Sequence, residues 1–72
     1  MSKLIIENNV RTQRFLHGEM TQKDLARAVG VSRQTIVAIE KGQYSPSLEL
    51  AFRLAMAFNT TVDELFHATE EK

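Results

Sequence analysis

Apolar residues recur at helical spacing in the second half of the chain. Five of them recur at helical spacing after Pro46, namely Leu48, Ala51, Leu54, Ala55 and Phe58. That spacing puts all five on one face of a helix, which we expect to be the central core helix. Ser47 can cap its start, Glu49 lies in the first turn where the helix dipole favours an acid, and Asn59-Thr60 ends it.

A shorter helix is predicted upstream, beginning at Thr21, whose hydroxyl can cap the amides that follow. Asp24 stands three residues later, where an acid completes a capping box, and Gly30 ends the helix because a positive φ costs glycine nothing. The residues expected to face inward are Leu25, Ala26 and Val29.

Ser32 can cap a further helix, with Ile36 and Ile39 on its buried side and Gly42 at its end. A three-residue turn containing Gly30 separates this helix from the preceding one. Two helices joined in this way form a helix-turn-helix, which we place at about residues 21–41.

The two ends of the chain complete the predicted fold. A first helix covers about residues 8–17, with three apolar positions at Val10, Phe15 and Leu16. Thr61 caps a short fifth helix, with acids in its first turn and Leu65 facing inward. Residues 3–7 and 66–70 can pair as antiparallel strands, because the first stretch is β-branched and compact domains tend to bring their termini together; frayed ends are the alternative.

Composition limits the classes of protein that this sequence can represent. With 72 residues, 43% hydrophobic and 25% charged, the chain is expected to be one globular domain, residues 1–72, with a core small enough to benefit from a partner subunit. The absence of cysteine excludes disulfides, thiolate zinc sites and a cysteine nucleophile. The apolar run at residues 4–6 is too short for a signal peptide or membrane span, so we expect a soluble, cytoplasmic protein.

The zero net charge conceals an asymmetry along the chain. Residues 1–46 hold seven Lys and Arg against four Asp and Glu, a charge of +3, whereas residues 47–72 carry −3. This layout suits a domain that turns one face towards phosphates, although solvated charged faces are also common.

The third predicted helix carries polar side chains that its cap does not require. With Ile36 and Ile39 inside, Arg33 and Gln34 point outward in the first turn, followed by Val37 and Ala38. The N-terminal end of such a helix meets base edges in the major groove, where Arg can bond bidentately to guanine and Gln to adenine. Thr35 can reach a phosphate or a thymine methyl group.

Several motifs together resemble a known family. They are Thr21-Gln22, LARAVGVSRQTI at 25–36, IEKG at 39–42 and SPSLELA at 45–51. In this order they resemble the Cro/CI-type helix-turn-helix regulators, also called the XRE family, over about residues 8–66. The resemblance implies an all-α, five-helix lambda-repressor-like DNA-binding domain. Within the family the chain is most similar to small stand-alone repressors of the cytolysin-repressor kind, homodimers whose termini form a two-stranded antiparallel sheet.

The resemblance assigns roles to individual residues of this chain. It places Gln22 on a DNA phosphate, Arg33 and Gln34 on bases, and Thr35 on both. It also marks further positions of the DNA-binding surface, namely Ser32, Ala38, Lys41, Gln43 and Tyr44. At the position of Ala38, phage repressors often carry a longer polar side chain that contacts bases, so this chain departs from them there. Lys41, Gln43 and Tyr44 match the loop after the helix, which contacts the DNA backbone again.

Two more sets of residues concern architecture. Arg14 and Glu40 match a charged pair packed behind the recognition helix, with a solvated pair as the alternative. Val62 and Phe66, expected to point outward on the fifth helix, match a dimer patch with Ser45 near it, although such residues are also ordinary on surfaces.

Other functions are less well supported. His17 and His67 are fifty positions apart without a further ligand at metal spacing, and no nucleophile motif or glycine-rich phosphate loop is present, so we expect neither catalysis nor a metal or other cofactor. The leading hypothesis is a homodimeric sequence-specific transcriptional repressor on a pseudo-palindromic operator. The alternatives are the DNA-binding antitoxin of a toxin–antitoxin pair and a protein-interaction module that has lost DNA binding. The expected partners are double-stranded DNA and a second copy of the chain, with no membrane and no small-molecule ligand.

Overall fold

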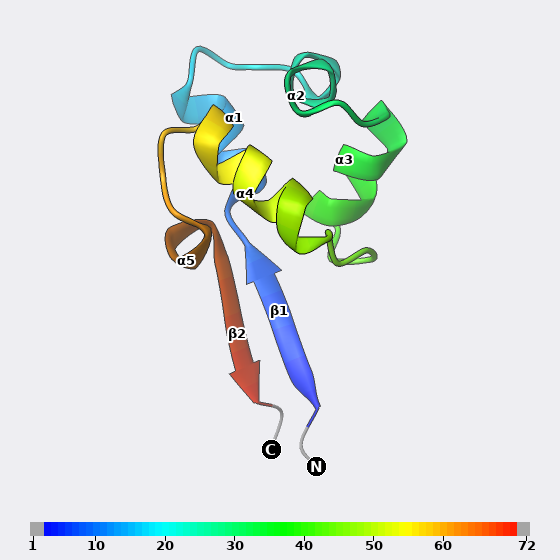
Figure 1. The fold of residues 1–72 in the computed structure, drawn as a ribbon, viewed down its shortest axis with the longest axis vertical. Helices are drawn as coiled ribbons and strands as arrows, with labels where there is room; N and C mark the ends of the chain where they lie inside the picture. Colours follow the sequence, from blue (N-terminus) through cyan, green and yellow to red (C-terminus); the bar gives the residue numbers. More distant parts are fainter. Residues whose placement is uncertain (1–2, 71–72) are drawn as a thin grey trace.

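The computed structural model describes residues 3–70 and contains five helices and two strands. Their order is β1 (Leu4–Asn8), α1 (Val10–Leu16), α2 (Gln22–Val29), α3 (Arg33–Glu40), α4 (Leu48–Ala57), α5 (Val62–Leu65) and β2 (Phe66–Glu70). The predicted five helices and terminal sheet are therefore confirmed. The helices gather at one end of the molecule, and the two strands project from them side by side (Figure 1).

Side-chain caps start four of the helices, as the sequence predicted. In each case a hydroxyl oxygen accepts a hydrogen bond from the backbone amide three residues later, which satisfies a donor that the first helical turn leaves free. The four caps are Thr21 for α2, Ser32 for α3, Ser47 for α4 and Thr61 for α5. The helix boundaries thus follow from local hydrogen bonding that the sequence encodes directly.

The turn between α2 and α3 depends on Gly30. This residue adopts the left-handed conformation with a φ of 76°, and the following Val31 amide donates to the Ala26 carbonyl at 3.0 Å. A side chain would strain this backbone conformation. Gly30 therefore lets the chain turn at once into the Ser32 cap and fixes α3 against α2.

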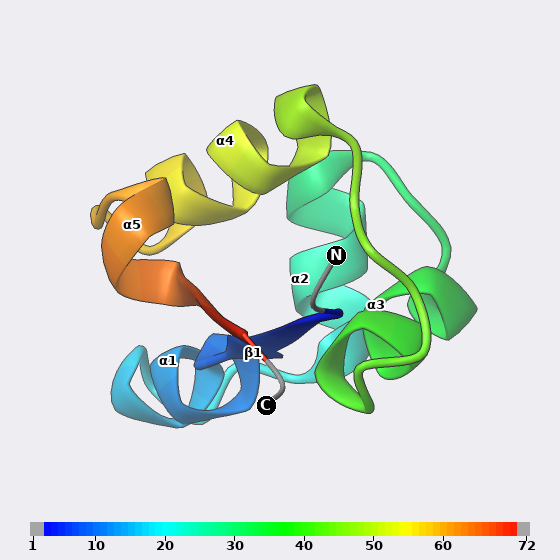
Figure 2. The same cartoon turned by 90° about the horizontal axis from the view of Figure 1, so that it is seen from below.

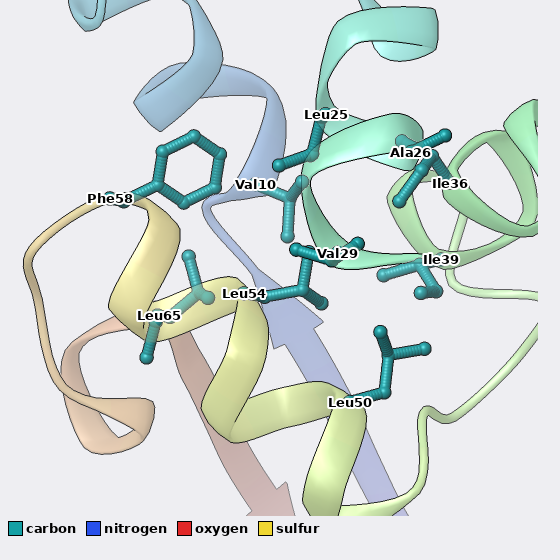
Figure 3. Packing of buried hydrophobic residues seen from close by; sticks show 11 residues of the cluster. Val10, Leu25, Ala26, Val29, Ile36, Ile39, Leu50, Leu54, Phe58 and Leu65 are labelled. Atoms are coloured by element: carbon teal, nitrogen blue, oxygen red, sulfur yellow. The ribbon is translucent and has the colours of Figure 1, made fainter. Parts of the chain in front are cut away.

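The core lies between α2, α3 and α4 and is closed by single residues of α1 and α5 (Figure 3). Its buried apolar residues are Val10, Leu25, Ala26, Val29, Ile36, Ile39, Leu50, Ala51, Leu54, Ala55, Phe58 and Leu65. All the inward positions predicted for α2, α3 and α5 are confirmed, so helical periodicity was sufficient for those elements.

The prediction for Leu48 was wrong. Leu48 is 71% exposed, whereas Leu50, which was not expected in the core, is only 7% exposed. Both residues fit helical spacing to later core residues, Leu48 to Ala51 and Leu50 to Leu54. The packing partners on α2 and α3 decide between them, because they lie against the Leu50–Leu54 side of α4 (Figure 3).

In α1 only Val10 is buried among the three apolar positions, and Phe15 and Leu16 are exposed.

The two strands are antiparallel, with Leu4 opposite Glu70 and Asn8 opposite Phe66. At the base of the sheet the Asn8 side-chain amide donates to the Ile39 carbonyl at 2.9 Å, and the Asn9 backbone amide donates to the Leu65 carbonyl at 2.9 Å. These bonds anchor the sheet to α3 and α5. Seen along the strands, α3 and α5 lie on opposite sides of the sheet (Figure 2).

Candidate nucleic-acid interface

The first turn of α3 presents polar side chains to solvent. Arg33 and Gln34 are exposed, while Ile36 and Ile39 are buried and hold the opposite face of the helix in the core. The Ser32 hydroxyl caps the helix and lies 3.0 Å from the hydroxyl of half-buried Thr35. Packing thus fixes the helix, and the two long polar side chains are free to contact a partner.

A cleft of about 600 Å³ runs along one side of α3, towards α1 and α2. Its lining includes Gln22, Arg33 and Lys41, together with two cations that the sequence reasoning did not single out, Arg11 and Lys23. The cleft also contains Arg14 and the acids Glu19 and Glu40, so cationic side chains outnumber anionic ones by five to two. A concave surface of this charge attracts anions such as phosphates.

Glu40 ties three helices together at the floor of this cleft. Its carboxylate accepts from Arg14 Nε at 2.6 Å and from Arg14 Nη2 at 3.0 Å, and Arg14 Nη1 donates to the Met20 carbonyl at 2.8 Å. The predicted pair is therefore formed, with side-chain exposures of only 15% for Arg14 and 7% for Glu40. Bidentate geometry makes such a pair directional as well as attractive.

The same carboxylate also positions Gln22. Gln22 Nε2 donates to Glu40 Oε1 at 3.2 Å, which holds the first residue of α2 beside the end of α3. An amide nitrogen carries two hydrogens, so one remains free to donate to another acceptor. Gln22 is consequently oriented within the cleft by the residue that also anchors α1.

A second cleft, of about 380 Å³, lies on the α4 side of α3. Thr35, Tyr44 and Arg53 are among its lining residues, and Arg53 forms an exposed ion pair of 2.8 Å with Glu49. Arg53 is a further cation near α3 that sequence reasoning did not connect with the site. The start of α3 therefore stands as a ridge between two clefts.

The structure divides the predicted DNA-binding residues into groups. Gln22, Arg33 and Lys41 share the first cleft, and Thr35 and Tyr44 share the second. The remaining four lie outside the lining of both clefts: Gln34 and Gln43 are exposed, Ala38 is half-buried, and Ser32 serves as the α3 cap. The positive charge of residues 1–46 was the sequence signal for Arg11 and Lys23, but only the fold shows that they share a cleft.

The predicted dimer residues are less exposed than expected. Val62 and Phe66 are both half-buried and pack against the core, and Phe66 begins β2, as the strand predicted at residues 66–70 requires, so it does not lie within α5. The outward orientation predicted for them was therefore wrong in part, because the chain enters the strand directly after Leu65. Phe66 and Ser45 do line one small hollow at the base of the sheet.

Within residues 3–70 the structure offers no group of three or more His, Cys, Asp or Glu residues suited to a metal ion. None of the helices in this described range has both the length and the apolar character needed to cross a membrane.

Comparison with known proteins identifies the family. The helix-turn-helix family pattern matches residues 13–65, most of the chain. An uncharacterized HTH-type transcriptional regulator of Methanocaldococcus jannaschii, MJ0272, is 51% identical over 61 residues, which are 85% of this chain and 91% of that protein. The chain thus belongs to the helix-turn-helix family, in its Cro/CI-type (XRE) branch of transcriptional regulators.

Two further similarities extend the comparison. The cryptic phage CTXphi transcriptional repressor RstR of Vibrio cholerae is 35% identical over 52 residues, which are 72% of this chain and 47% of RstR. The crystal structure of the transcriptional regulator VanUg matches with a TM-score of 0.74 at 21% identity, covering 99% of this chain and 93% of that one. The latter similarity confirms the fold, including the arrangement of five helices with a terminal sheet.

Proposed function

We propose that this protein is a homodimeric, sequence-specific DNA-binding repressor of transcription. The observation that carries the proposal is the exposed Arg33-Gln34 pair at the start of α3, beside a cleft lined by Arg11, Lys23 and Lys41. Groups that can read bases and groups that can bind phosphates occur together there. The relative RstR, itself a repressor, supports repression as the sign of regulation.

In the proposed complex the start of α3 lies in the major groove. Arg33 bonds to a guanine, Gln34 bonds to an adenine, and the cleft receives the adjacent phosphodiester backbone. Gln22 donates its free amide hydrogen to a phosphate, aided by the positive N-terminus of α2. Thr35 and Tyr44 face the second cleft, which is suited to the backbone on the other side of the helix.

Two subunits would place their α3 helices in successive major grooves, roughly 34 Å apart, on a pseudo-palindromic operator. A protein-interaction module without DNA binding would give Arg33 and Gln34 no reason to stand beside the cation-lined cleft. The clustering of these groups therefore favours DNA over a protein partner at this surface.

Paired substitutions test the division of roles between base and backbone contacts. Gln34→Ala should weaken binding to the operator by about 1–3 kcal/mol and relax the preference at one base pair, because it removes a base contact. Gln22→Ala should weaken operator and random DNA alike, because phosphates carry no sequence information. Fluorescence anisotropy with a set of single-base operator variants measures both effects.

Gln13→Ala is the matched control, because Gln13 is a half-buried glutamine of α1 that lines neither cleft. It should leave both affinities unchanged. Equal losses on operator and random DNA for Gln34→Ala and Gln22→Ala would contradict the proposed roles.

A further inference from the structure

The two-stranded sheet is anchored to the helices at its base, but beyond the base it receives little support from the rest of the described chain. It projects from the helical body (Figure 1), and Leu4, Ile5 and Ile6 are 57%, 43% and 46% exposed. An isolated two-stranded sheet is marginally stable in water and needs a covered apolar face or additional strands. A sheet with this much exposed aliphatic surface is therefore expected to pack against a partner.

The two faces of the sheet differ in chemistry. Side chains of paired residues point to the same face, and successive residues alternate between faces. One face combines Leu4, Ile6, Ala68 and Phe66, with Asn8 at the base and Glu70 at the tip; we call it the apolar sheet face. The opposite face carries Ile5 together with three polar residues, Glu7, His67 and Thr69.

The apolar sheet face continues into a hollow at its base. Ile6 and Phe66 line this hollow together with Ile39, Ser45 and Pro46. Its volume of about 30 Å³ is far below the roughly 300–1,000 Å³ of pockets that hold small-molecule ligands. The hollow is therefore too small to hold a ligand of that kind.

The character of this face points to a second copy of the chain as that partner. Symmetric dimers bring the same patch of both subunits together, so the patch must be complementary to itself. Glu70, at the tip, is the one formally charged side chain on the apolar sheet face of Leu4–Asn8 and Phe66–Glu70, so two such faces can meet with little like-charge repulsion. Apart from Ile5, the opposite face carries the polar residues Glu7, His67 and Thr69, so it offers less apolar area to such a contact.

The area needed for a stable dimer supports the same conclusion. Specific interfaces bury about 800 Å² on each partner, through roughly 20–30 residues a side. Ser45, Val62 and Phe66 alone fall far short of this, and the adjoining strand face enlarges the available surface by Leu4, Ile6 and Ala68. We propose that the second subunit packs on the apolar sheet face and the hollow at its base. This inference rests on the homodimer of the proposed function and names the surface that forms it.

Neighbouring isoleucines provide a sharp test. Ile5 and Ile6 are adjacent and almost equally exposed, but they lie on opposite faces of the sheet. Ile6→Lys should raise the dimer dissociation constant about 100-fold, because each subunit loses an apolar contact and gains a facing charge. Ile5→Lys should leave it within about threefold of the wild-type value. Sedimentation velocity over a dilution series, with circular dichroism as a check of folding, measures both.

A third variant guards against misfolding of Ile6→Lys. Leu4 lies at the far end of the sheet, outside both the core and the hollow, so Leu4→Lys should preserve the helical fold while also weakening the dimer at least tenfold. Dimers of unchanged stability in Leu4→Lys and Ile6→Lys, or equal weakening by Ile5→Lys, would overturn the proposed surface while leaving the homodimer intact. A wild-type protein that sediments as a monomer on and off DNA would overturn both.

Discussion

At the scale of single residues, Glu40 connects three helices. Glu40 is the last residue of α3. Its carboxylate binds Arg14 of α1 bidentately and accepts a hydrogen bond from Gln22 of α2. Both members of the ion pair are largely withdrawn from water, so each depends on the other for compensation of its lost hydration. The pair therefore holds the end of α3 against α1.

Removing one partner should be more harmful than removing both. Glu40→Leu leaves the Arg14 guanidinium largely buried without its counter-ion, and we expect the free energy of unfolding to fall by about 3–5 kcal/mol. The double variant Arg14→Met with Glu40→Leu should recover a large part of this loss, because neither charge then remains. Urea unfolding of the two single variants and the double variant gives the comparison.

A loss below about 1 kcal/mol for Glu40→Leu would show that the pair behaves like a solvated one. Glu49→Ala serves as the control, since its ion pair with Arg53 is exposed and its removal is expected to change stability by less than about 1 kcal/mol.

At the scale of helices and strands, the sequence predicts most of the fold because local chemistry determines the boundaries. The caps at Thr21, Ser32, Ser47 and Thr61 and the turn at Gly30 were all readable as residue types at fixed spacing. The β-branched residues of the first stretch suggested the terminal strands, but the family resemblance was the stronger support for their pairing, since the two strands lie more than fifty residues apart in the sequence. Pairing over such a distance leaves no local pattern.

Leu48 and Leu50 show where helical periodicity fails to predict which residue is buried. At the first turn of α4 both residues match the helical spacing of the core, and the packing of α2 and α3 selects Leu50. The candidate site, too, could be predicted only in part from the sequence. The sequence could predict Arg33 and Gln34 as readers, but Arg11 and Lys23 join Gln22 in one cleft only through the tertiary arrangement of three helices.

Capping of α3 gives a prediction for this element. Ser32→Ala should lower the free energy of unfolding by about 1 kcal/mol, because the Thr35 amide loses its side-chain acceptor at 3.2 Å. Ser32→Gly should cost only a few tenths of a kcal/mol, since glycine is itself an acceptable N-cap. Thermal or urea unfolding distinguishes the two variants, and an equal effect of both would argue against the cap as a source of stability.

At the scale of the whole molecule, charge and shape are polarised. The net charge is zero, yet five cations line the cleft beside α3 and the acidic residues are concentrated after residue 46. The sheet projects from the helical body along the longest dimension of 38 Å (Figure 1). A neutral protein with this layout can bind a polyanion through one face, with an affinity that depends strongly on salt.

The most direct test of the account is the affinity of the purified protein for DNA. We would measure fluorescence anisotropy with DNA from upstream of its own gene and with sequences selected by the protein from a random pool, adding unlabelled random DNA and varying salt. We predict dissociation constants of about 10⁻⁸ M or lower that survive the competitor and rise steeply with salt. Failure to select any sequence, with weak and equal binding to all DNA, would contradict the central claim that α3 reads bases.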